Sequence, residues 1–137
     1  MPLHPPASAD MVQTSLGTVW IWIPTPGVVV TVVKGVISAQ LAGHWCEVVL
    51  RKTADQTRLE SFHDWEEMTD YDGEARTLLI DTSKKLRPKS ERVHILFRSK
   101  IVALGVRVAS TILPHLVSYT DRSLFQAALD KAKLRHA

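Results

Sequence analysis

Among the residues that could do chemistry, the adjacent pair His63 and Asp64 has the clearest potential. A histidine beside a carboxylate can act as a general base that the carboxylate orients, or it can supply half of a metal site. Adjacent residues usually point in different directions, however, and no nucleophile with a supporting motif accompanies the pair. A hydrolase that uses His63 and Asp64 is therefore the weakest of three functional hypotheses.

Other catalytic and metal-binding patterns are absent from the sequence. Cys46 is the only cysteine, which excludes an intrachain disulfide and a tetrahedral thiolate metal site. His44 lies two positions from Cys46 on an expected helix, so the two side chains cannot face one metal ion; we expect a buried thiol and an exposed imidazole. Glycine-rich phosphate loops, a zinc-protease helix motif and a nucleophile elbow are also missing. We expect no catalytic residue, no metal and no cofactor, in a protein of the reducing cytoplasm.

Six acidic residues and no base lie between Asp64 and Glu74. One interpretation is an acidic recognition surface around Trp65, which would bind a basic partner or a cation. The other is that acids gather near Asp72 because the N-terminus of the helix expected there favours negative charge. Only the first interpretation gives a role to the tryptophan. The predicted partner-binding residues are Trp65, Glu66, Glu67 and Asp70.

Seven bases and the single acid Glu91 lie between Lys84 and Lys100. Such a segment can bind the phosphate groups of nucleic acid or of lipid head groups. It lacks the interleaved aromatic residues that stack on bases, and the formal net charge of the chain is only +3. We therefore expect a solvated loop here and no nucleic-acid partner.

Trp20 and Trp22 alternate with Val19, Ile21 and Ile23, which is the period of two that a strand requires. The two tryptophans therefore share one face, where they either pack beneath a helix or form an exposed aromatic pair. Large aromatic side chains are enriched where proteins meet. The pair is a candidate interface, and a homodimer is one use for it.

The elements that must position these residues alternate between apolar strands and amphipathic helices. Apolar or alternating runs predict strands at 17–23, 28–34, 57–62, 92–98 and 116–119. Helical spacing predicts four helices, whose N-caps are Ser38, Asp72, Ser99 and Asp121. Strands separated by helix-length segments are joined by crossovers, which predicts an α/β domain with a largely parallel sheet. A short turn between the first two strands predicts an antiparallel hairpin.

A chain of 137 residues is long enough for one hydrophobic core, and we expect one domain over residues 17–137. Residues 1–16 contain three prolines and no apolar periodicity, which predicts a flexible N-terminal tail, and they lack the pattern of a signal peptide. The apolar stretch from Ile101 to Leu113 is shorter than the roughly 20 residues that span a bilayer. It predicts a helix that is buried on nearly all sides, with Gly105 and Ala109 close to a neighbour.

Several segments together resemble a known family. They are the strand Val28 to Gly35, the pair Tyr71–Asp72 with Arg76, the run Phe97 to Val106, and Tyr119 to Asp121 followed by Phe125 and Ala127–Ala128. On these residues the chain resembles the STAS superfamily, and most of all its SpoIIAA-like, anti-sigma factor antagonist-like branch.

The resemblance implies a mixed sheet of four to five strands with about four helices, and a non-catalytic protein-binding module of bacterial regulation or signalling. Classical members carry a phosphorylatable serine in an Asp-Ser-Ser-Gly type loop, whereas the segment from Phe62 to Asp70 has neither serine nor glycine. Thr69 is its only hydroxyl, and the surrounding acids would repel a phosphate. We therefore expect no classical phosphoserine switch, with Thr69 as the one candidate for modification.

A carrier of a small apolar or lipid-like ligand is the remaining hypothesis. Such a ligand would lie between the helices and the sheet, in a cavity lined by residues such as Val102, Val106 and Leu124. A packed core at that place would remove this hypothesis.

Overall fold

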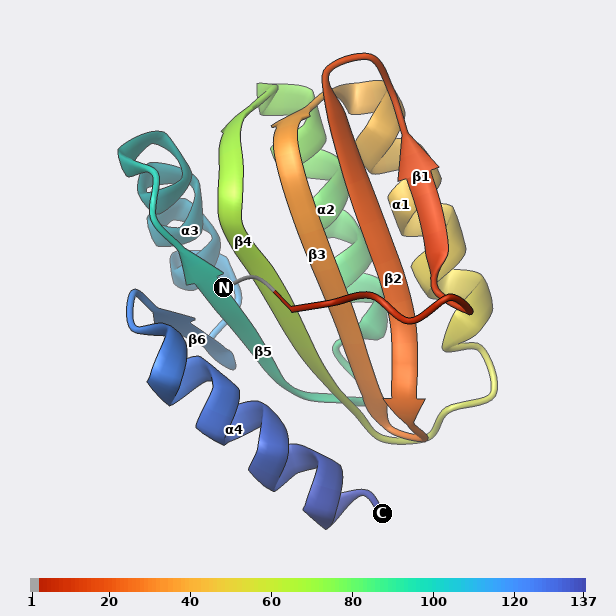
Figure 1. Ribbon diagram of the computed structural model, residues 1–137. Coiled ribbons are helices and arrows are strands. Elements are labelled where there is room, and N and C mark those ends of the chain that lie inside the picture. The colour runs from red at the N-terminus through yellow and green to blue at the C-terminus, as the bar shows by residue number, and fades with distance from the viewer. Residues whose placement is uncertain (1–2) are drawn as a thin grey trace.

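The computed structural model describes residues 3–137, which form an α/β fold of six strands and four helices (Figure 1). The strands are Asp10–Gln13 (β1), Gly17–Thr25 (β2), Val28–Ile37 (β3), Leu59–Tyr71 (β4), Ser90–Phe97 (β5) and Leu116–Tyr119 (β6). The helices are Ala39–Lys52 (α1), Gly73–Leu86 (α2), Lys100–Ile112 (α3) and Arg122–Arg135 (α4). All six strands form one sheet in the order of the sequence, so the predicted α/β class is confirmed.

The sheet is mixed, because β1, β2 and β3 are antiparallel neighbours whereas β3 to β6 run parallel. The antiparallel pair of β2 and β3 is joined by a tight turn, in which Gly27 takes a φ of 92° in the left-handed region that favours glycine. The parallel strands are joined through helices, since a parallel connection must cross back over the sheet. The register places Val30 beside Phe62 and Phe62 beside His94, which forms one row across the centre of the sheet.

The sixth strand comes from the segment that was expected to be a flexible tail. Asp10–Gln13 pairs with β2, with Met11 opposite Trp20, so this part of residues 1–16 belongs to the sheet. Four residues are too few to show an alternating pattern, which is why the sequence did not indicate β1. Residues 3–9 cross the open face of the sheet in front of β2 and β3 (Figure 1), and residues 1 and 2 lie outside the described part of the chain.

The helices cover the two faces of the sheet unequally. On one face, which we call the helix-rich face, α1, α2 and α3 pack over the larger hydrophobic core. On the other, which we call the α4 face, α4 alone packs against the sheet, beside residues 3–9 (Figure 1). The core of the α4 face joins Val30, Phe62 and Leu96 of the strands to Phe125 and Leu129 of the helix.

All four helices begin directly after their predicted caps, and three of these caps bond to the first turn. The side chains of Ser38, Ser99 and Asp121 each accept hydrogen bonds from backbone N–H groups of the first turn. Asp72 also precedes its helix, but its carboxylate accepts a hydrogen bond from the N–H of Ala39 at 3.1 Å. Asp72 therefore ties the start of α2 to the start of α1.

The path of β4 differs most from the predicted elements. The sequence predicts a strand over 57–62 and then an acidic loop, and this is wrong, because β4 continues to Tyr71. Acidic residues are depleted in strands, but pairing with β3 up to Tyr71, and with β5 as far as Trp65, overrides that local preference. The register gains one extra residue in β4 between Asp64 and Glu67, which is typical of a β-bulge.

Candidate functional site

The predicted partner-binding residues do not share one surface. Alternation along β4 turns Trp65 toward the helix-rich core, whereas Glu66 reaches α4 on the other side of the sheet. The bulge then places Glu67 beside Lys34, and Asp70 is exposed near the end of the strand. The structure therefore separates the tryptophan from the acids that were expected to surround it.

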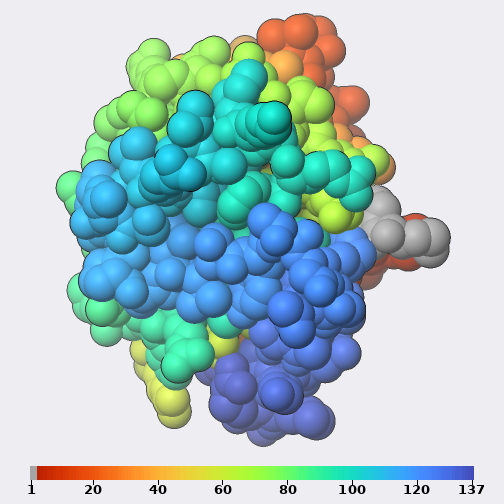
Figure 2. Space-filling model, turned by 90° about the vertical axis from the view of Figure 1, so that its left-hand side faces the viewer, coloured from red at the N-terminus to blue at the C-terminus, as the bar shows by residue number. Residues whose placement is uncertain are grey.

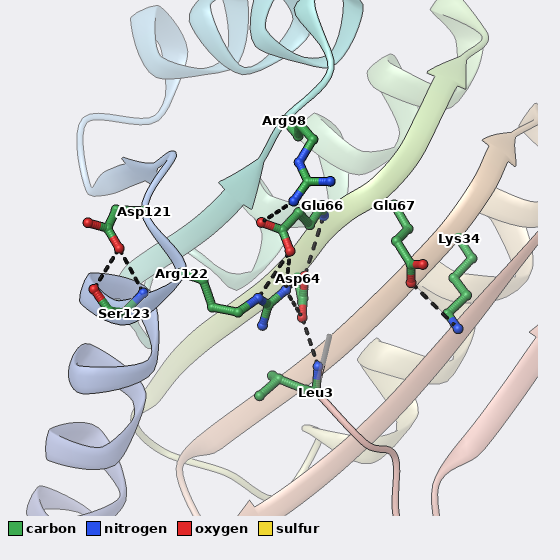
Figure 3. Close-up of polar contacts among 9 residues, drawn as sticks. All are labelled: Leu3, Lys34, Asp64, Glu66, Glu67, Arg98, Asp121, Arg122 and Ser123. Carbon is green, nitrogen blue, oxygen red and sulfur yellow. Dashed lines mark hydrogen bonds and ion pairs between the residues drawn. The ribbon is translucent and has the colours of Figure 1, made fainter. Parts of the chain in front are cut away.

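Asp64 and Glu66 form an ionic cluster with Arg122 at the start of α4 (Figure 3). Arg122 Nη2 donates to both carboxylate oxygens of Asp64 at 2.8 Å and to Glu66 at 2.9 Å. Arg98 lies 3.3 Å from the other oxygen of Glu66, and the N–H of Leu3 donates to Asp64 at 3.1 Å. Because the Asp64 side chain is only 1% exposed, this cluster holds α4 and the N-terminal residues to β4 and does not present Asp64 to a partner.

Opposite charges keep this cluster ionised. Burial acts to raise the pKa of Glu66, but the hydrogen bond from Arg122 and the charges of Arg122 and Arg98 outweigh burial and hold it below its usual value. Burial likewise acts to lower the pKa of Arg122, and the two carboxylates raise it instead. The pairing of Arg122 with β4 therefore persists through the neutral pH range.

The exposed part of the acidic segment is smaller than expected. Glu67 makes an ion pair with Lys34 at 3.5 Å in which both side chains are about half exposed (Figure 3). Thr69 and Asp70 are also exposed on β4. These three residues can meet a partner, and modification of Thr69 stays a prediction.

Trp65 belongs to an aromatic cluster of the core. Its ring lies 5.9 Å from that of Trp45 in an edge-to-face arrangement and 5.6 Å from that of His63. Its indole Nε1 is buried and has no hydrogen-bond partner within residues 3–137. Trp65 therefore has a structural role in packing the core. The preference of a helix N-terminus for acidic residues gave it no role.

His63 and Asp64 point to opposite faces of the sheet. His63 lies on the helix-rich face, where its Nδ1 forms a 2.7 Å hydrogen bond with Thr31 Oγ1. Burial, with a smaller contribution from the charge of His94, lowers the pKa of His63 from 6.5 to about 3, so its ring is neutral at physiological pH. Because Asp64 pairs with Arg122 across the sheet, it cannot orient His63, and the expected pair for a hydrolase does not form.

A second polar cluster lies at the other end of α4, and sequence reasoning missed it. Glu60 accepts hydrogen bonds from Arg135 at 2.7 and 2.8 Å and pairs with His94 Nε2 at 2.7 Å, while His94 Nδ1 meets Tyr119 Oη at 2.8 Å. The ring of Phe62 stacks on that of His94 with centroids 4.1 Å apart. Glu60 and His94 are buried, so a substrate cannot reach them while α4 stays in place.

The electrostatics of this second cluster favour a carboxylate and a neutral histidine. Burial acts to raise the pKa of Glu60, but hydrogen bonds from Arg135 and His94 hold it below its usual value. Burial lowers the pKa of His94, and the opposing effect of Glu60 does not compensate. The spacing of Glu60, Phe62 and Asp64 along one strand was the sequence signal, since alternate residues share a face. It was missed because β4 was expected to end at Phe62.

Trp20 and Trp22 lie on the α4 face of β2, and both are partly buried. Trp22 packs against the core beneath α4, and the ammonium of Lys34 lies 5.5 Å from the centre of the Trp20 ring. Residues 3–9 pass over this region, and Pro6 lines the hollows beside both tryptophans. A homodimer through the pair stays a prediction.

α3 is less buried than the sequence predicts. Val102, Gly105 and Val106 face the core, and a Cβ on Gly105 would lie 2.6 Å from Tyr71 Oη, which confirms the expected close contact. Four large apolar side chains of the same helix are nevertheless exposed by 40–57%: Ile101, Leu104, Val108 and Ile112. The expectation of burial on nearly all sides was wrong because α3 is the last helix of its layer and solvent reaches its outer side (Figures 1 and 2).

The residues expected to line a ligand cavity are not together. Val102 and Val106 line a small cavity on the helix-rich face, whereas Leu124 is 61% exposed on α4 across the sheet. Within residues 3–137, no group of three or more His, Cys, Asp or Glu side chains could hold a metal ion. The four helices of this part of the chain are too short or too polar to cross a membrane.

Comparison with known proteins finds this architecture in solved structures. No protein-family model matches the chain, and no curated protein matches it. An uncharacterized protein of the DUF3478 family with a SpoIIAA-like fold, from Shewanella loihica PV-4, aligns with a TM-score of 0.65 and 17% identity over 87% of this chain and 97% of its own. An anti-sigma factor antagonist from Mycobacterium paratuberculosis aligns with a TM-score of 0.60 and 16% identity over 92% and 97%.

These similarities cover nearly the whole of each solved chain, and at such low identity they concern the fold alone. They agree with the mixed sheet and the four helices described above. The chain therefore has the SpoIIAA-like, STAS-type fold that its sequence resembles.

Proposed function

We propose that the chain is a non-catalytic protein-binding module of bacterial regulation, and that α3 forms its binding surface. The observation that carries this proposal is the stripe of four exposed apolar side chains on α3, which we call the α3 stripe: Ile101, Leu104, Val108 and Ile112. The fold shared with an anti-sigma factor antagonist supports a regulatory role. The single cysteine agrees with a reducing cytoplasm.

The α3 stripe differs from the other exposed apolar residues because its members are contiguous. Spacings of three and four residues place them along one side of the helix. The other large exposed apolar side chains are scattered over β1, the turn after it and α4: Met11, Leu16, Leu124 and Leu134. Scattered apolar residues are normal on a protein surface, whereas a contiguous patch with polar neighbours marks an interaction site.

Charge defines the chemistry of the partner. Between Arg92 and Thr120 the chain contains four bases and no acid, and two of these bases, Lys100 and Arg107, are exposed on α3 itself. A complementary partner presents an apolar strip bordered by acidic side chains, such as the apolar face of an acidic amphipathic helix. We therefore propose a protein partner of this kind.

The exposed acids of β4 form a second part of the proposal, in which the partner carries basic side chains beyond its acidic strip. β4 ends at the same edge of the sheet at which α3 begins (Figure 1), and Glu67, Thr69 and Asp70 are exposed residues of its last part. Two residues stabilise this part of β4: Trp65 packs against the core, and Glu66 accepts a hydrogen bond from Arg122. A Glu67→Lys, Asp70→Lys variant tests the edge: weaker capture of the partner supports its part in binding, and unchanged capture removes it from the surface.

The test of the α3 surface is affinity capture followed by reconstitution. The wild type, a Leu104→Asp, Val108→Asp variant and the control Leu134→Asp on α4 are used as baits, and the captured protein is then purified and titrated. We expect the α3 variant alone to lose binding by at least tenfold, because burying an unpaired carboxylate in an apolar interface is costly. Equal binding by all three, or binding to anionic vesicles with no protein partner, contradicts the proposal.

Self-association through the tryptophan pair needs a separate experiment. Light scattering compares the mass of the wild type with that of a Trp20→Ser, Trp22→Ser variant. A wild-type dimer that becomes monomeric in the variant supports the interface. A monomeric wild type, or a dimer that persists in the variant, removes it.

The other two hypotheses receive less support. A hydrolase lacks its orienting carboxylate, because Asp64 lies across the sheet from His63. A lipid carrier lacks the expected cavity, because Leu124 is not on the same side of the sheet as Val102 and Val106. The helix-rich face contains a different cavity, which is too small for a lipid chain.

A further inference from the structure

The helix-rich face contains a cavity of about 90 Å³ that the proposed protein-binding role does not use. Its floor is the sheet and its walls come from α1, α2 and α3. A second cavity of about 50 Å³ lies beside it. Five residues line both cavities: Trp65, Leu79, Ile80, Ile95 and Ala109. The two cavities are therefore neighbouring parts of one gap between α2 and α3.

The lining of the larger cavity excludes a charged occupant. No Asp, Glu, Lys or Arg side chain of the described residues 3–137 lines it, and most of its wall is apolar, whereas Arg76 lines the smaller cavity beside it. Its titratable groups are His63, which is neutral, and Cys46, whose thiol pKa is raised by burial. An ion entering this space would lose its hydration without gaining an opposite charge.

Among the polar side chains that line the cavity, His63 is held in a fixed orientation. His63 is held by the hydrogen bond between its Nδ1 and Thr31 Oγ1, and its ring lies edge-on to Trp45 at 6.0 Å. Its Nε2 has no hydrogen-bond partner within residues 3–137, although His63 lines the cavity. A fixed imidazole with one free nitrogen in an apolar space suits a ligand that carries one complementary polar group.

Size limits the ligand to a single small ring. An engineered apolar cavity of about 150 Å³ is known to hold benzene, whereas pockets for larger organic ligands reach roughly 300 Å³ or more. The two neighbouring cavities together approach the first value and stay far below the second. A lipid chain does not fit without separation of α2 from α3.

We propose that this gap is a binding site for a small, neutral, mostly apolar ring compound with one hydrogen-bonding group, which His63 Nε2 recognises. The aromatic rings of Trp45 and Trp65 line the site, and so does Ala109 of α3. The site is separate from the α3 stripe, so either proposal can fail without the other.

The probes for this site are phenol and benzene, which differ by one hydroxyl. Both are titrated into the full chain while the indole N–H signal of Trp65 is followed by NMR. We expect saturable shifts with both, and tighter binding of phenol by roughly threefold to tenfold, because one hydrogen bond is added. No saturable shift with either probe, or equal affinity for the two, overturns the proposal.

Three variants locate the binding. His63→Leu is expected to remove the preference for phenol, Ala109→Phe to abolish binding of both probes by filling the gap, and the control Leu124→Ala to change neither. If Ala109→Phe does not fold, Ser83→Leu from the α2 side of the same cavity replaces it. Retained phenol preference without the imidazole, or retained binding in the filled variant, places the site elsewhere.

The pH dependence gives an independent readout. Because His63 has a pKa of about 3, phenol affinity is expected to be the same at about pH 5.5 as at about pH 8. A change of affinity that follows a group titrating near neutrality contradicts recognition by His63.

Discussion

The two faces of the sheet stabilise the same strands by opposite means. On the α4 face, buried carboxylates of β4 meet arginines at both ends of one helix, Asp64 with Arg122 and Glu60 with Arg135. On the helix-rich face, three helices bury apolar side chains, the partly buried imidazole of His63 is neutral, and the packing leaves a gap. The single helix on one face is therefore anchored by ion pairs at both of its ends, whereas the layer of three helices on the other face contains a void.

This division originates in the alternation of β4. Glu60, Phe62 and Asp64 point to the α4 face, whereas His63 and Trp65 point to the helix-rich face. Position along the strand therefore decides whether a side chain meets charge or apolar surface. The experiments below change one face at a time.

The largest effect is expected from Arg122→Ala. This change leaves the carboxylate of Asp64 buried without its cation, and such losses cost about 3 kcal/mol in the free energy of unfolding. Urea denaturation measures the loss. The matched control is Arg98→Ala, which removes a 75% exposed partner of Glu66 in the same cluster and is expected to cost less than about 1 kcal/mol. Equal losses for the two variants contradict the burial argument.

A pair of identical substitutions compares the packing of the faces. Ala132 is fully buried on the sheet-facing side of α4, so Ala132→Leu should lower the free energy of unfolding by about 2 kcal/mol through overpacking. Ala109 lines the gap on the helix-rich face, so Ala109→Leu should be neutral or stabilise by up to about 1 kcal/mol. Thermal or urea unfolding gives the sign. A large loss for Ala109→Leu would show that the gap is not available space.

The neutral imidazole of the helix-rich face predicts a dependence of stability on pH. The pKa of His63 falls from 6.5 in the unfolded chain to about 3 in the folded one, so below pH 6.5 the unfolded chain binds the proton first. Its contribution to stability is complete above that value and is lost by about 1.4 kcal/mol for each pH unit as the pH falls toward 3.

The His63→Leu variant isolates this contribution. Its unfolding free energy should fall less steeply than that of the wild type between pH 6.5 and about 5, by about 1.4 kcal/mol per unit. The lowered pKa of His94 contributes to the slope of both proteins and cancels in the comparison. Parallel slopes would contradict a buried neutral His63.

The smallest effect on the free energy of unfolding is expected for an exposed ion pair on the α4 face. Lys34→Ala removes the half-exposed pair with Glu67 and the contact of its ammonium with Trp20. Exposed pairs contribute little, so the loss should stay below about 1 kcal/mol in urea denaturation. A loss as large as that of Arg122→Ala would remove the distinction between buried and exposed ions.

The sequence predicts those features that depend on local pattern. The cap of Ser38 and the apolar stripe through Leu41 and Trp45 were correct because three to four residues of spacing define a helix face. The hairpin turn at Gly27 was correct for the same local reason. Local pattern therefore sufficed for the order of elements and for the fold class.

The candidate site depended on contacts that no local pattern contains. The acids of β4 predicted a loop. The strand was missed because the arginines that pair with these acids, Arg98, Arg122 and Arg135, lie far away in the sequence. The apolar content of α3 predicted burial on nearly all sides. This prediction was wrong because the sequence does not show whether another helix covers the outer side of α3. The gap beside His63 arises from the spacing of α2 and α3, which is set by the whole sheet.

The central claim, that this fold acts by binding a protein through α3, has one direct test. A photo-reactive amino acid is placed at Leu104 on α3, which is 57% exposed, and, as the control, at Leu134 on α4, which is 78% exposed, and each protein is irradiated in the cells that make it. We expect a covalent adduct with one partner protein from the Leu104 position alone. Adducts of equal yield from both positions, or none from Leu104, would contradict it.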